Sequence, residues 1–343
     1  MSGSRKVTLA EVAASAGVST TTASYILNGR SAQMRISADT ERRVREAVAT
    51  LGYRPNRNAR SLRTAKTSTV GVITDFVASG MFASAMLAGA NAAARQADLL
   101  LVIGESEGDV AVRDRLIDEM LDRQVDGILY VTRTALRTPL PAKLRGAQTV
   151  MLNCFDPEGS APAVLADERS GGRTAAEVLL RAGIDSDVFI VGEDPEPLAI
   201  AGPLRLQGVR ERLGEAGAEV AGIVPCEWGV ETAYVATQDW LGAGHVPRGL
   251  ICMNDRVAMG AYEALAESGL AVPDQVSVVS FDGSDLALWL RPHLTSVSLP
   301  FREMGALAVQ LLLDPHRPSG TRLVPMELLA GSSVRGKVAT ARA

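Results

Sequence analysis

From Thr69 onward, short runs of β-branched and aliphatic residues alternate with stretches of helical character. The runs lie at residues 70–73, 99–103, 127–131, 149–152, 188–191, 250–253 and 276–281. The stretches expected to form helices lie at residues 81–97, 110–123, 171–182, 204–216 and 255–268. This alternation predicts parallel β-sheets with crossover helices. About eleven strands are too many for one comfortable sheet, so we expect an α/β body of two lobes.

The N-terminal segment predicts a different, all-α unit. Thr8 and Glu11 have the spacing of a capping box, so a helix is expected to begin at Leu9. Gly17 suits the tight turn that ends this helix, and Ser19 is expected to cap a second helix over the stretch TTTASYIL. The pattern is therefore helix, short turn, helix.

A third helix is expected over residues 38–51, where it ends at Gly52. Inward-facing residues of the second and third helices would form a small core. These residues are Ala23, Ile26, Val44, Val48 and Leu51. Two short helices joined by a glycine turn can present the N-terminal end of the second helix to the major groove of DNA. Thr20, Thr21 and Tyr25 are then expected to face the bases, although such patterns also occur in helical hairpins that do not bind DNA.

The charge distribution favours the DNA-binding alternative. The whole chain has a net charge of -4, but residues 1–66 carry +8 and the remainder carries -12. Phosphate contacts supply the sequence-independent part of DNA affinity, so a basic head on an acidic body is typical of a polyanion-binding module. A merely solvated basic surface would have the same charge, so charge alone does not decide the question.

Three stretches of the head together carry a specific resemblance. They are VTLAEVAASAGVSTTTASYILNGR from Val7, Tyr53-Arg54-Pro55-Asn56, and Ala59-Arg60-Ser61-Leu62. They closely resemble the lactose-repressor/galactose-repressor (LacI/GalR) family of bacterial regulators. The resemblance implies that residues 56–63 fold into a hinge helix on the operator, with Leu62 as a wedge in the minor groove. An apolar wedge of this kind unstacks a base step and bends the duplex, whereas the alternative is an ordinary basic linker.

The pattern and the resemblance together name the expected DNA-contacting residues. They are Thr8, Ser19, Thr20, Thr21, Thr22, Ser24, Tyr25, Asn28, Asn56, Arg57, Ala59, Arg60 and Leu62. Tyr25 departs from well-known members, which often carry arginine at that position. The familiar pairing of arginine with guanine is absent there, so no operator sequence can be transferred to this chain.

The resemblance extends through the body to about Val334. Its landmarks, in order, are Val70-Gly71-Val72, the stretches DRQVDG from Asp122 and DERSGG from Asp167, Arg205 with Gly208, Met253-Asn254-Asp255, VVSFD from Val278 and LTSV from Leu294. They imply a two-lobed periplasmic-binding-protein type I fold with parallel sheets and three crossovers. The expected units are a helix-turn-helix domain at 1–54, a hinge at 55–67, a ligand-sensing and dimerisation domain at 68–334 and a tail at 335–343. The N-lobe would hold 68–166 and 299–325, and the C-lobe 167–296 and 326–334.

Ligands of open α/β sheets bind beyond the carboxyl ends of the strands, which line the cleft of a two-lobed protein. This rule and the family positions predict a set of ligand-binding residues. They are Asp75, Met81, Phe82, Asn153, Arg205, Trp228, Asn254 and Asp282. Carboxylate and amide groups bind hydroxyls, arginine supplies a fork of donors, and an indole stacks on a sugar ring, so a carbohydrate or a nucleoside is expected.

Several of these residues have a structural alternative. Arg205 would also suit a pair with a surface carboxylate, and Trp228 would suit a partly buried core position. Asp255, which follows Asn254, is expected to cap the helix that follows it. Asn153 and Leu299 depart from some sugar-responsive members, which carry aspartate and a polar residue there. These departures indicate a ligand less hydroxylated than a simple hexose.

No constellation for catalysis, cofactor or metal binding is visible. The three histidines are widely spaced, and neither a GxSxG elbow nor an HExxH helix is present. The cysteines Cys154, Cys226 and Cys252 form no CxxC pair and are expected to be buried, reduced thiols. An enzyme is therefore not favoured, and no cofactor or metal is expected.

The remaining predictions concern the partners of the protein and its location in the cell. No apolar run is long enough to cross a membrane and no signal sequence is recognised, which favours a cytoplasmic protein over a solute receptor for transport. The tail lacks the leucine heptads of a tetramerising coiled coil, so a homodimer on a palindromic double-stranded DNA operator is expected. The resemblance implies a repressor whose operator affinity is controlled by a small molecule bound between the lobes. A regulator that responds to a protein partner remains the alternative.

Overall fold

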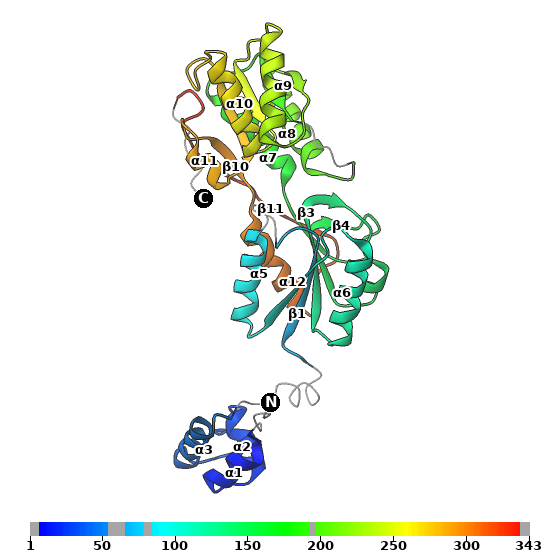
Figure 1. Cartoon of the computed structure of the whole chain (residues 1–343), viewed down its shortest axis with the longest axis vertical. Coiled ribbons are helices and arrows are strands. Elements are labelled where there is room, and N and C mark those ends of the chain that lie inside the picture. The colour runs from blue at the N-terminus through cyan, green and yellow to red at the C-terminus, as the bar shows by residue number, and fades with distance from the viewer. Residues whose placement is uncertain (1–6, 54–65, 79–83, 193–196, 337–343) are drawn as a thin grey trace, which may run out of the picture. The chain divides into compact units, whose positions relative to one another are not determined.

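A computed structural model describes residues 7–53, 66–78, 84–192 and 197–336. The chain divides into two compact units, Met1–Thr67 and Ser68–Ala343, which we call the head and the body. The body is built from two α/β lobes and the head is helical, which confirms the predicted fold class. Each unit is described separately (Figure 1).

The head contains helices α1 (Leu9–Ala16), α2 (Thr20–Leu27) and α3 (Ala38–Leu51). The predicted capping box is present, because Thr8 Oγ1 accepts a hydrogen bond from Glu11 N and Glu11 Oε2 accepts one from Thr8 N. Gly17 has a φ of 64°, a left-handed conformation that glycine adopts without strain. The α1–α2 turn therefore forms as the sequence predicts.

The three helices of the head enclose a small apolar core. The buried members are Val12, Ala13, Ala16, Ala23, Ile26, Val44 and Ala47. Val48 and Leu51, predicted to line the inner face of α3, are only partly buried at its edge. Alanines at the helix contacts let such short helices approach closely, so little apolar area is needed to hold them together.

The N-lobe of the body is a six-stranded sheet in the order β11-β5-β4-β3-β1-β2, and all its pairings are parallel. Its strands are β1 (Thr69–Thr74), β2 (Leu100–Glu105), β3 (Gly127–Arg137), β4 (Thr149–Phe155), β5 (Ala163–Ala166) and β11 (Thr321–Val324). Helices α5 (Ser84–Gln96) and α12 (Phe301–Leu313) cover one face, and α6 (Val110–Asp122) and the short 3-10 helix Ala142–Leu144 cover the other (Figure 1). Alternate strand residues therefore enter two different cores.

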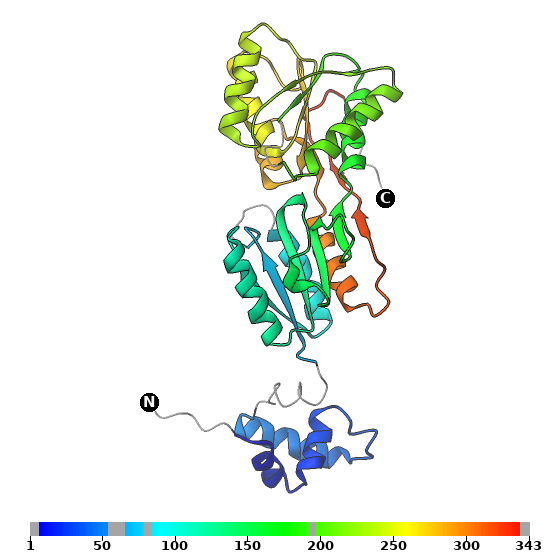
Figure 2. The same cartoon turned by 90° about the vertical axis from the view of Figure 1, so that its right-hand side faces the viewer.

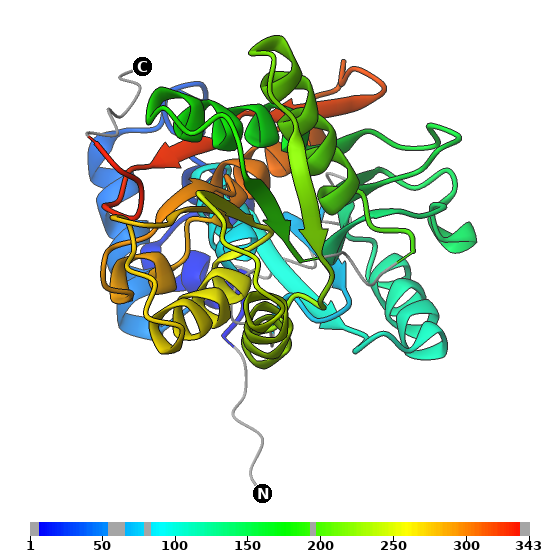
Figure 3. The ribbon, with the colours of Figure 1, turned by 90° about the horizontal axis from the view of Figure 1, so that it is seen from above.

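The C-lobe sheet has the order β12-β10-β9-β8-β6-β7, and only β12 is antiparallel. Its strands are β6 (Val188–Val191), β7 (Val220–Val224), β8 (Gly249–Cys252), β9 (Ser277–Asp282), β10 (Thr295–Ser298) and β12 (Glu327–Leu329). Helices α7 (Glu168–Arg181) and α8 (Ala201–Glu215) lie on one face. Helices α9 (Val230–Gly242) and α10 (Asp255–Glu267) lie on the other, and α11 (Asp285–Trp289) follows β9 (Figure 3).

The chain passes between the lobes three times. It leaves the N-lobe after β5, returns to it between β10 and α12, and crosses again between β11 and β12 (Figure 2). The strand ends that lead into these crossings are the carboxyl ends of β5, β10 and β11, so polar residues that follow such ends are brought to the region between the lobes.

Apart from the five-residue α11, two α-helices of the body were not among those predicted. Helix α12 is amphipathic, since it exposes Arg302, Glu303 and Gln310 and buries the face that carries Met304, Ala308 and Leu312, so its pattern was within reach of the sequence and was missed. Helix α9 contains valine, threonine, tyrosine and tryptophan, which weaken its helical signature. The predicted helix at 81–97 is described only from Ser84 onward.

Glycines allow three pairs of helices to pack at very short distances. A Cβ added at Gly208 of α8 would overlap the carbonyl oxygen of Arg169 on α7, and one at Gly172 of α7 would overlap that of Arg205 on α8. The pairs α5–α12 and α9–α10 meet through similar glycines. The α7–α8 contact matters for function, because these two helices carry Glu168 and Arg205.

Candidate functional site

Helix α2 presents the candidate DNA-contacting surface of the head. Thr20 and Thr21 are exposed on its first turn and Tyr25 is half-buried one turn later. Ser19, Thr22, Ser24 and Asn28 take part in hydrogen bonds that shape the helix, since Ser19 Oγ accepts from Thr22 N and Asn28 Nδ2 donates to Ser24 O. Thr8 is exposed but takes part in the α1 capping box. Asn56, Arg57, Ala59, Arg60 and Leu62 lie outside the described residues.

The body contains a cavity of about 330 Å³ that both lobes line. The N-lobe sheet and the crossover to α12 supply Arg133, Thr134, Ala135, Asn153, Leu299 and Phe301. The C-lobe supplies Glu168, Ala201, Arg205, Trp228, Asn254, Arg256 and Asp282. A cavity of this size suits a ligand about as large as a monosaccharide or a nucleoside.

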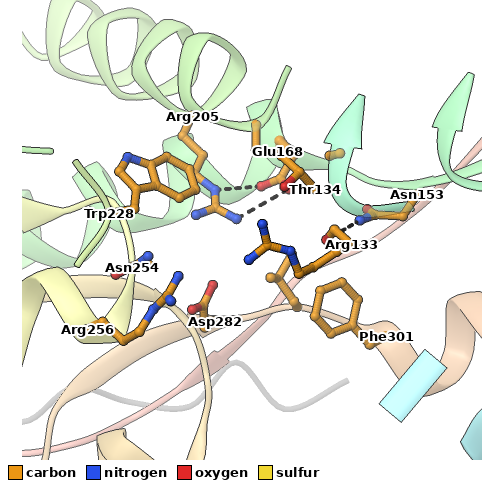
Figure 4. A pocket seen from close by; sticks show the side chains of 13 residues that line it. Arg133, Thr134, Asn153, Glu168, Arg205, Trp228, Asn254, Arg256, Asp282 and Phe301 are labelled. Carbon is orange, nitrogen blue, oxygen red and sulfur yellow. Dashed lines mark hydrogen bonds and ion pairs between the residues drawn. The ribbon is translucent and has the colours of Figure 1, made fainter. Parts of the chain in front are cut away.

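A buried ion pair forms the C-lobe wall of the cavity. Arg205 on α8 and Glu168 at the start of α7 are 1% and 2% exposed, and Arg205 Nε lies 2.7 Å from Glu168 Oε2 (Figure 4). Arg205 also donates to the carbonyl oxygen of Met253, and its guanidinium lies 4.5 Å from the Phe281 ring centroid. Arg205 therefore pairs with a buried carboxylate, and the alternative of a surface partner is wrong.

Trp228 lies on the other side of this guanidinium. Its ring centroid is 5.3 Å from Arg205 Cζ, a distance at which the ring face attracts the cation. Gly192 lies beside the indole with a φ of 109°, a backbone conformation that favours glycine. The indole is half-buried and packs on the apolar cores of the C-lobe, as the structural alternative expects, and it also lines the cavity, so its ligand-binding role stays a prediction.

Asn254 is the cap of α10. Its Oδ1 accepts a hydrogen bond of 2.7 Å from Val257 N, which fixes the orientation of the side-chain amide. The Nδ2 group is buried and has no hydrogen-bond partner within the described parts of the chain. A buried donor without a partner is costly, so an acceptor from a ligand would stabilise it.

Asp255 does not cap α10, and the prediction that it does is wrong. It is the first helical residue and is fully buried. Its Oδ1 accepts hydrogen bonds from the hydroxyls of Ser280 and Ser296, and its Oδ2 accepts from Ser284 N and Oγ. The carboxylate therefore holds β9, β10 and the loop after β9 together, and that loop directly follows Asp282, the last residue of β9.

Asp282 lies at the carboxyl end of β9 with a φ of 109°, an unfavourable conformation for a residue other than glycine. Burial raises the pKa of its carboxyl group to about 7. Asp255 and Glu168 raise this pKa further, whereas Arg205 and Arg256 oppose the rise. The cavity is thus lined by a carboxyl group whose pKa lies close to neutral pH.

The raised pKa of Asp282 predicts a pH dependence of stability. The folded state binds the proton more tightly than the unfolded chain, so this contribution is complete below about pH 4 and is lost as the pH rises through about 7. We expect Asp282→Asn to remove roughly 2 kcal/mol of the fall in unfolding free energy over this range, less than the full shift because solvent reaches the cleft. Urea unfolding at about pH 5 and about pH 8 measures this, with exposed Asp274→Asn as the control. An unchanged pH dependence in Asp282→Asn would contradict the assignment.

Asn153 holds the N-lobe side of the cavity in place. It is 3% exposed, has a φ of 59°, and its Nδ2 donates to the carbonyl oxygens of Thr132 and Arg133, both at 3.0 Å. These two bonds fix the backbone from which the Arg133 side chain enters the cavity (Figure 4).

Comparison with known proteins identifies the family. Residues 8–56 match the model for bacterial regulatory proteins of the lacI family, and residues 160–334 match that for a periplasmic binding protein-like domain. The chain is 30% identical over 88% of its length to the HTH-type transcriptional regulator RegA of Clostridium saccharobutylicum, covering 90% of that protein. It belongs to the LacI family. The resemblance proposed from the sequence is therefore confirmed, and this family is one of transcriptional regulators, not of enzymes.

Further relatives and solved structures are also similar to this chain over most of its length. The ribose operon repressor of Haemophilus influenzae is 30% identical over 90% of the chain and 91% of its own length. The lac repressor dimer bound to operator and the anti-inducer ONPF has a TM-score of 0.78 at 26% identity, covering 96% of this chain and 99% of that one. The regulator CelR in complex with cellobiose has a TM-score of 0.67 at 27% identity, covering 96% and 100%.

The LacI-family fold brings five of the predicted ligand-binding residues to one cavity. These are Asn153, Arg205, Trp228, Asn254 and Asp282. Asp75 is not among the lining residues, and its Oδ1 accepts hydrogen bonds from Phe76 N and Arg133 N. Met81 and Phe82 lie outside the described residues.

Sequence reasoning missed five polar or aromatic residues that line the cavity of this LacI-family chain. They are Arg133, Thr134, Glu168, Arg256 and Phe301. Two of them were within reach of the rule on strand ends, because Glu168 follows β5 closely and Arg256 follows β8. Arg133 lies inside the long strand β3 at a register shift relative to β4, which no sequence pattern indicates.

The three cysteines lie in the body, and their thiols are free. Cys154 and Cys252 are buried and Cys226 is half-buried. Burial raises the pKa of Cys154 to about 12 and that of Cys226 to about 11, so both stay protonated near neutral pH. Over the described parts of the chain, every helix is too short or too polar to cross a bilayer.

Proposed function

We propose that this LacI-family regulator is a repressor whose affinity for its operator is controlled by a small hydroxylated ligand bound between the lobes of the body. The observation that carries the proposal is the cavity of about 330 Å³, where Arg205, Asp282 and the unpartnered Nδ2 of Asn254 meet. Asn153 and Trp228 complete the expected contacts. Asp75, Met81 and Phe82 remain predictions.

The relatives support the nature of the ligand and of the response. One is named for repression of a ribose operon, and solved LacI-family structures contain cellobiose or the anti-inducer ONPF. A carbohydrate or a nucleoside uses the same kinds of group, hydroxyls for Asp282 and Asn254 and a ring face for Trp228. We propose the same class of ligand here.

The head supplies the DNA-binding half of the function. We propose that residues 1–54 read the major groove through Thr20, Thr21 and Tyr25, and that residues 55–67 form a hinge with Leu62 as a minor-groove wedge. A homodimer with two-fold symmetry fits a palindromic operator, as in the lac repressor dimer solved with its operator. A protein with this role would work in the bacterial cytoplasm, where the chromosome lies.

The proposed mechanism is a two-state coupling. Ligand binding changes the relative orientation of the lobes within residues 68–334, which alters the spacing of the two hinges in the dimer and thereby the fit to the operator. Such a change requires the ligand to bind one of the two states better than the other.

The experiment combines DNA and ligand. A duplex selected from a random library by the full chain is labelled, and its affinity is measured by anisotropy over a salt series with Thr21→Ala and Leu62→Ala. Both variants should lose discrimination between the selected duplex and a scrambled one by about 10-fold, with a smaller loss of non-specific binding. Equal losses on both duplexes would contradict the base-reading and wedge roles.

The ligand arm uses the same duplex. Any compound that raises the melting temperature of the full chain binds its folded state, and it should also change the affinity for the selected duplex. A compound that stabilises the body and leaves operator affinity unchanged would contradict the proposed control by ligand.

A further inference from the structure

The cavity contains more positive than negative groups. Three arginines line it, Arg133, Arg205 and Arg256, against the two carboxyl groups of Glu168 and Asp282. Glu168 pairs with Arg205 through both of its oxygens. Asp282 is then the carboxyl group that faces Arg133 and Arg256 across the cavity (Figure 4). The side chains that line the cavity therefore include one more cationic than acidic group.

The hydrogen-bonding groups show the same imbalance. Asn254 is 1% exposed, and its cap on α10 leaves Nδ2 as a donor without a partner in the described structure. Arg133 and Arg256 add donors in the planar fork that matches a carboxylate or a phosphate. The raised pKa of Asp282 weakens it as the balancing anion, because part of its population is protonated near neutral pH. The cavity is therefore short of acceptors.

The places of Asn254, Arg256 and Arg133 in the fold also favour the binding of an anion. Asn254 and Arg256 lie at the N-terminus of α10, a helix of 13 residues whose dipole and first backbone N–H groups favour a negative charge. Arg133 approaches from the other lobe, on β3, where Asn153 fixes its backbone. Figure 4 shows the side chains of Arg133 and Arg256 extending toward the same space. An anion there would interact with both lobes.

We propose that the ligand of this cleft carries an oxyanion, a carboxylate or a phosphate, which Arg256 and Asn254 of the C-lobe and Arg133 of the N-lobe bind together. The inference rests on the proposed function and narrows its ligand class to acidic or phosphorylated sugars and nucleosides. The hydroxylated part of the ligand lies against Trp228, Arg205 and Asp282. Because the oxyanion binds groups of both lobes, it would stabilise the arrangement in which Arg133 and Arg256 line one cavity.

The test compares neutral probes with related anionic probes. The melting temperature of the full chain is measured with D-ribose, D-ribonate and D-ribose phosphate, with D-glucose, D-glucuronate and D-glucose phosphate, and with uridine and its monophosphate. We expect at least one anionic member to bind at least about 10-fold more tightly than its neutral parent, the effect of one charged hydrogen-bonded pair. The carboxylate and phosphate members of the two sugar sets distinguish the two forms of oxyanion.

Variants assign the effect to the proposed groups. Arg256→Gln and Arg133→Gln should each weaken the preferred anion by about 10-fold and leave the neutral parent nearly unchanged, and Arg256→Lys should recover part of the loss. Arg145→Gln, an exposed arginine outside the cavity, is the matched control and should bind as the original chain does. A loss equal for anion and parent would contradict the assignment.

Different results would contradict the oxyanion inference and the proposed control of operator affinity by a ligand. If a neutral sugar or nucleoside binds as tightly as its anionic forms and alters operator affinity, the oxyanion inference is wrong and the proposed function stands. If an anion binds in the cleft and operator affinity does not change, the proposed control is wrong and the inference about the cleft stands. The absence of any shift with every probe contradicts both.

Discussion

Replacing Arg205 with methionine is expected to lower the free energy of unfolding of the body by about 3–5 kcal/mol. The substitution leaves Glu168 2% exposed with no cation beside it, and it removes the hydrogen bond to the carbonyl oxygen of Met253. A buried carboxylate without its partner costs far more than the loss of the pair itself. The same variant is expected to abolish binding of any cleft ligand.

Urea unfolding followed by tryptophan fluorescence measures this loss. All three tryptophans lie in the body, so the signal does not report on the head. The double variant Arg205→Met with Glu168→Leu removes both charges and should recover most of the stability, because an apolar pair replaces an ion pair of similar volume. A loss below about 1 kcal/mol in the single variant would show that Glu168 is neutralised by another route.

Replacing Gly208 with alanine is expected to cost about 3 kcal/mol of body stability, because the new methyl group would overlap the carbonyl oxygen of Arg169. Relief requires helices α7 and α8 to move apart. That movement also separates Glu168 on α7 from Arg205 on α8, so ligand affinity should fall together with stability.

Gly214 provides a control on the same helix. It also lies in α8, but an added Cβ there would meet no atom within 4 Å. Gly214→Ala should therefore be neutral or stabilise the body by up to about 1 kcal/mol, since alanine is the better helix former. If Gly208→Ala were as mild as Gly214→Ala under urea unfolding, the close packing of α7 on α8 would not be needed for stability.

Much of the head was predictable because its signals are local. The capping box of Thr8 and Glu11, the left-handed turn at Gly17 and the cap at Ser19 each depend on residues at most three positions apart. The strands and most helices of the body were likewise predictable, since alternating apolar runs and helical stretches need no knowledge of distant contacts.

The site was predictable only in part. Asn153, Arg205, Trp228, Asn254 and Asp282 lie around one cavity, as the rule on strand ends suggested. Arg133 could not be predicted, because it lies in the part of β3 where the register to β4 shifts, and the sequence does not show this shift. The predicted capping role of Asp255 was wrong, because a sequence cannot show that three serines from distant segments surround its carboxylate.

The sequence by itself therefore determined the family, the helical head, the alternating body and the strand ends from which a ligand site would be built. Tertiary structure alone decided the chemistry of that site: which carboxylate pairs with Arg205, which amide donor of Asn254 lacks an acceptor, and how many arginines share one cavity. The physical reason is range. Caps, turns and hydrophobic periodicity act within a few residues, whereas burial and charge balance depend on groups that only the folded lobes bring together.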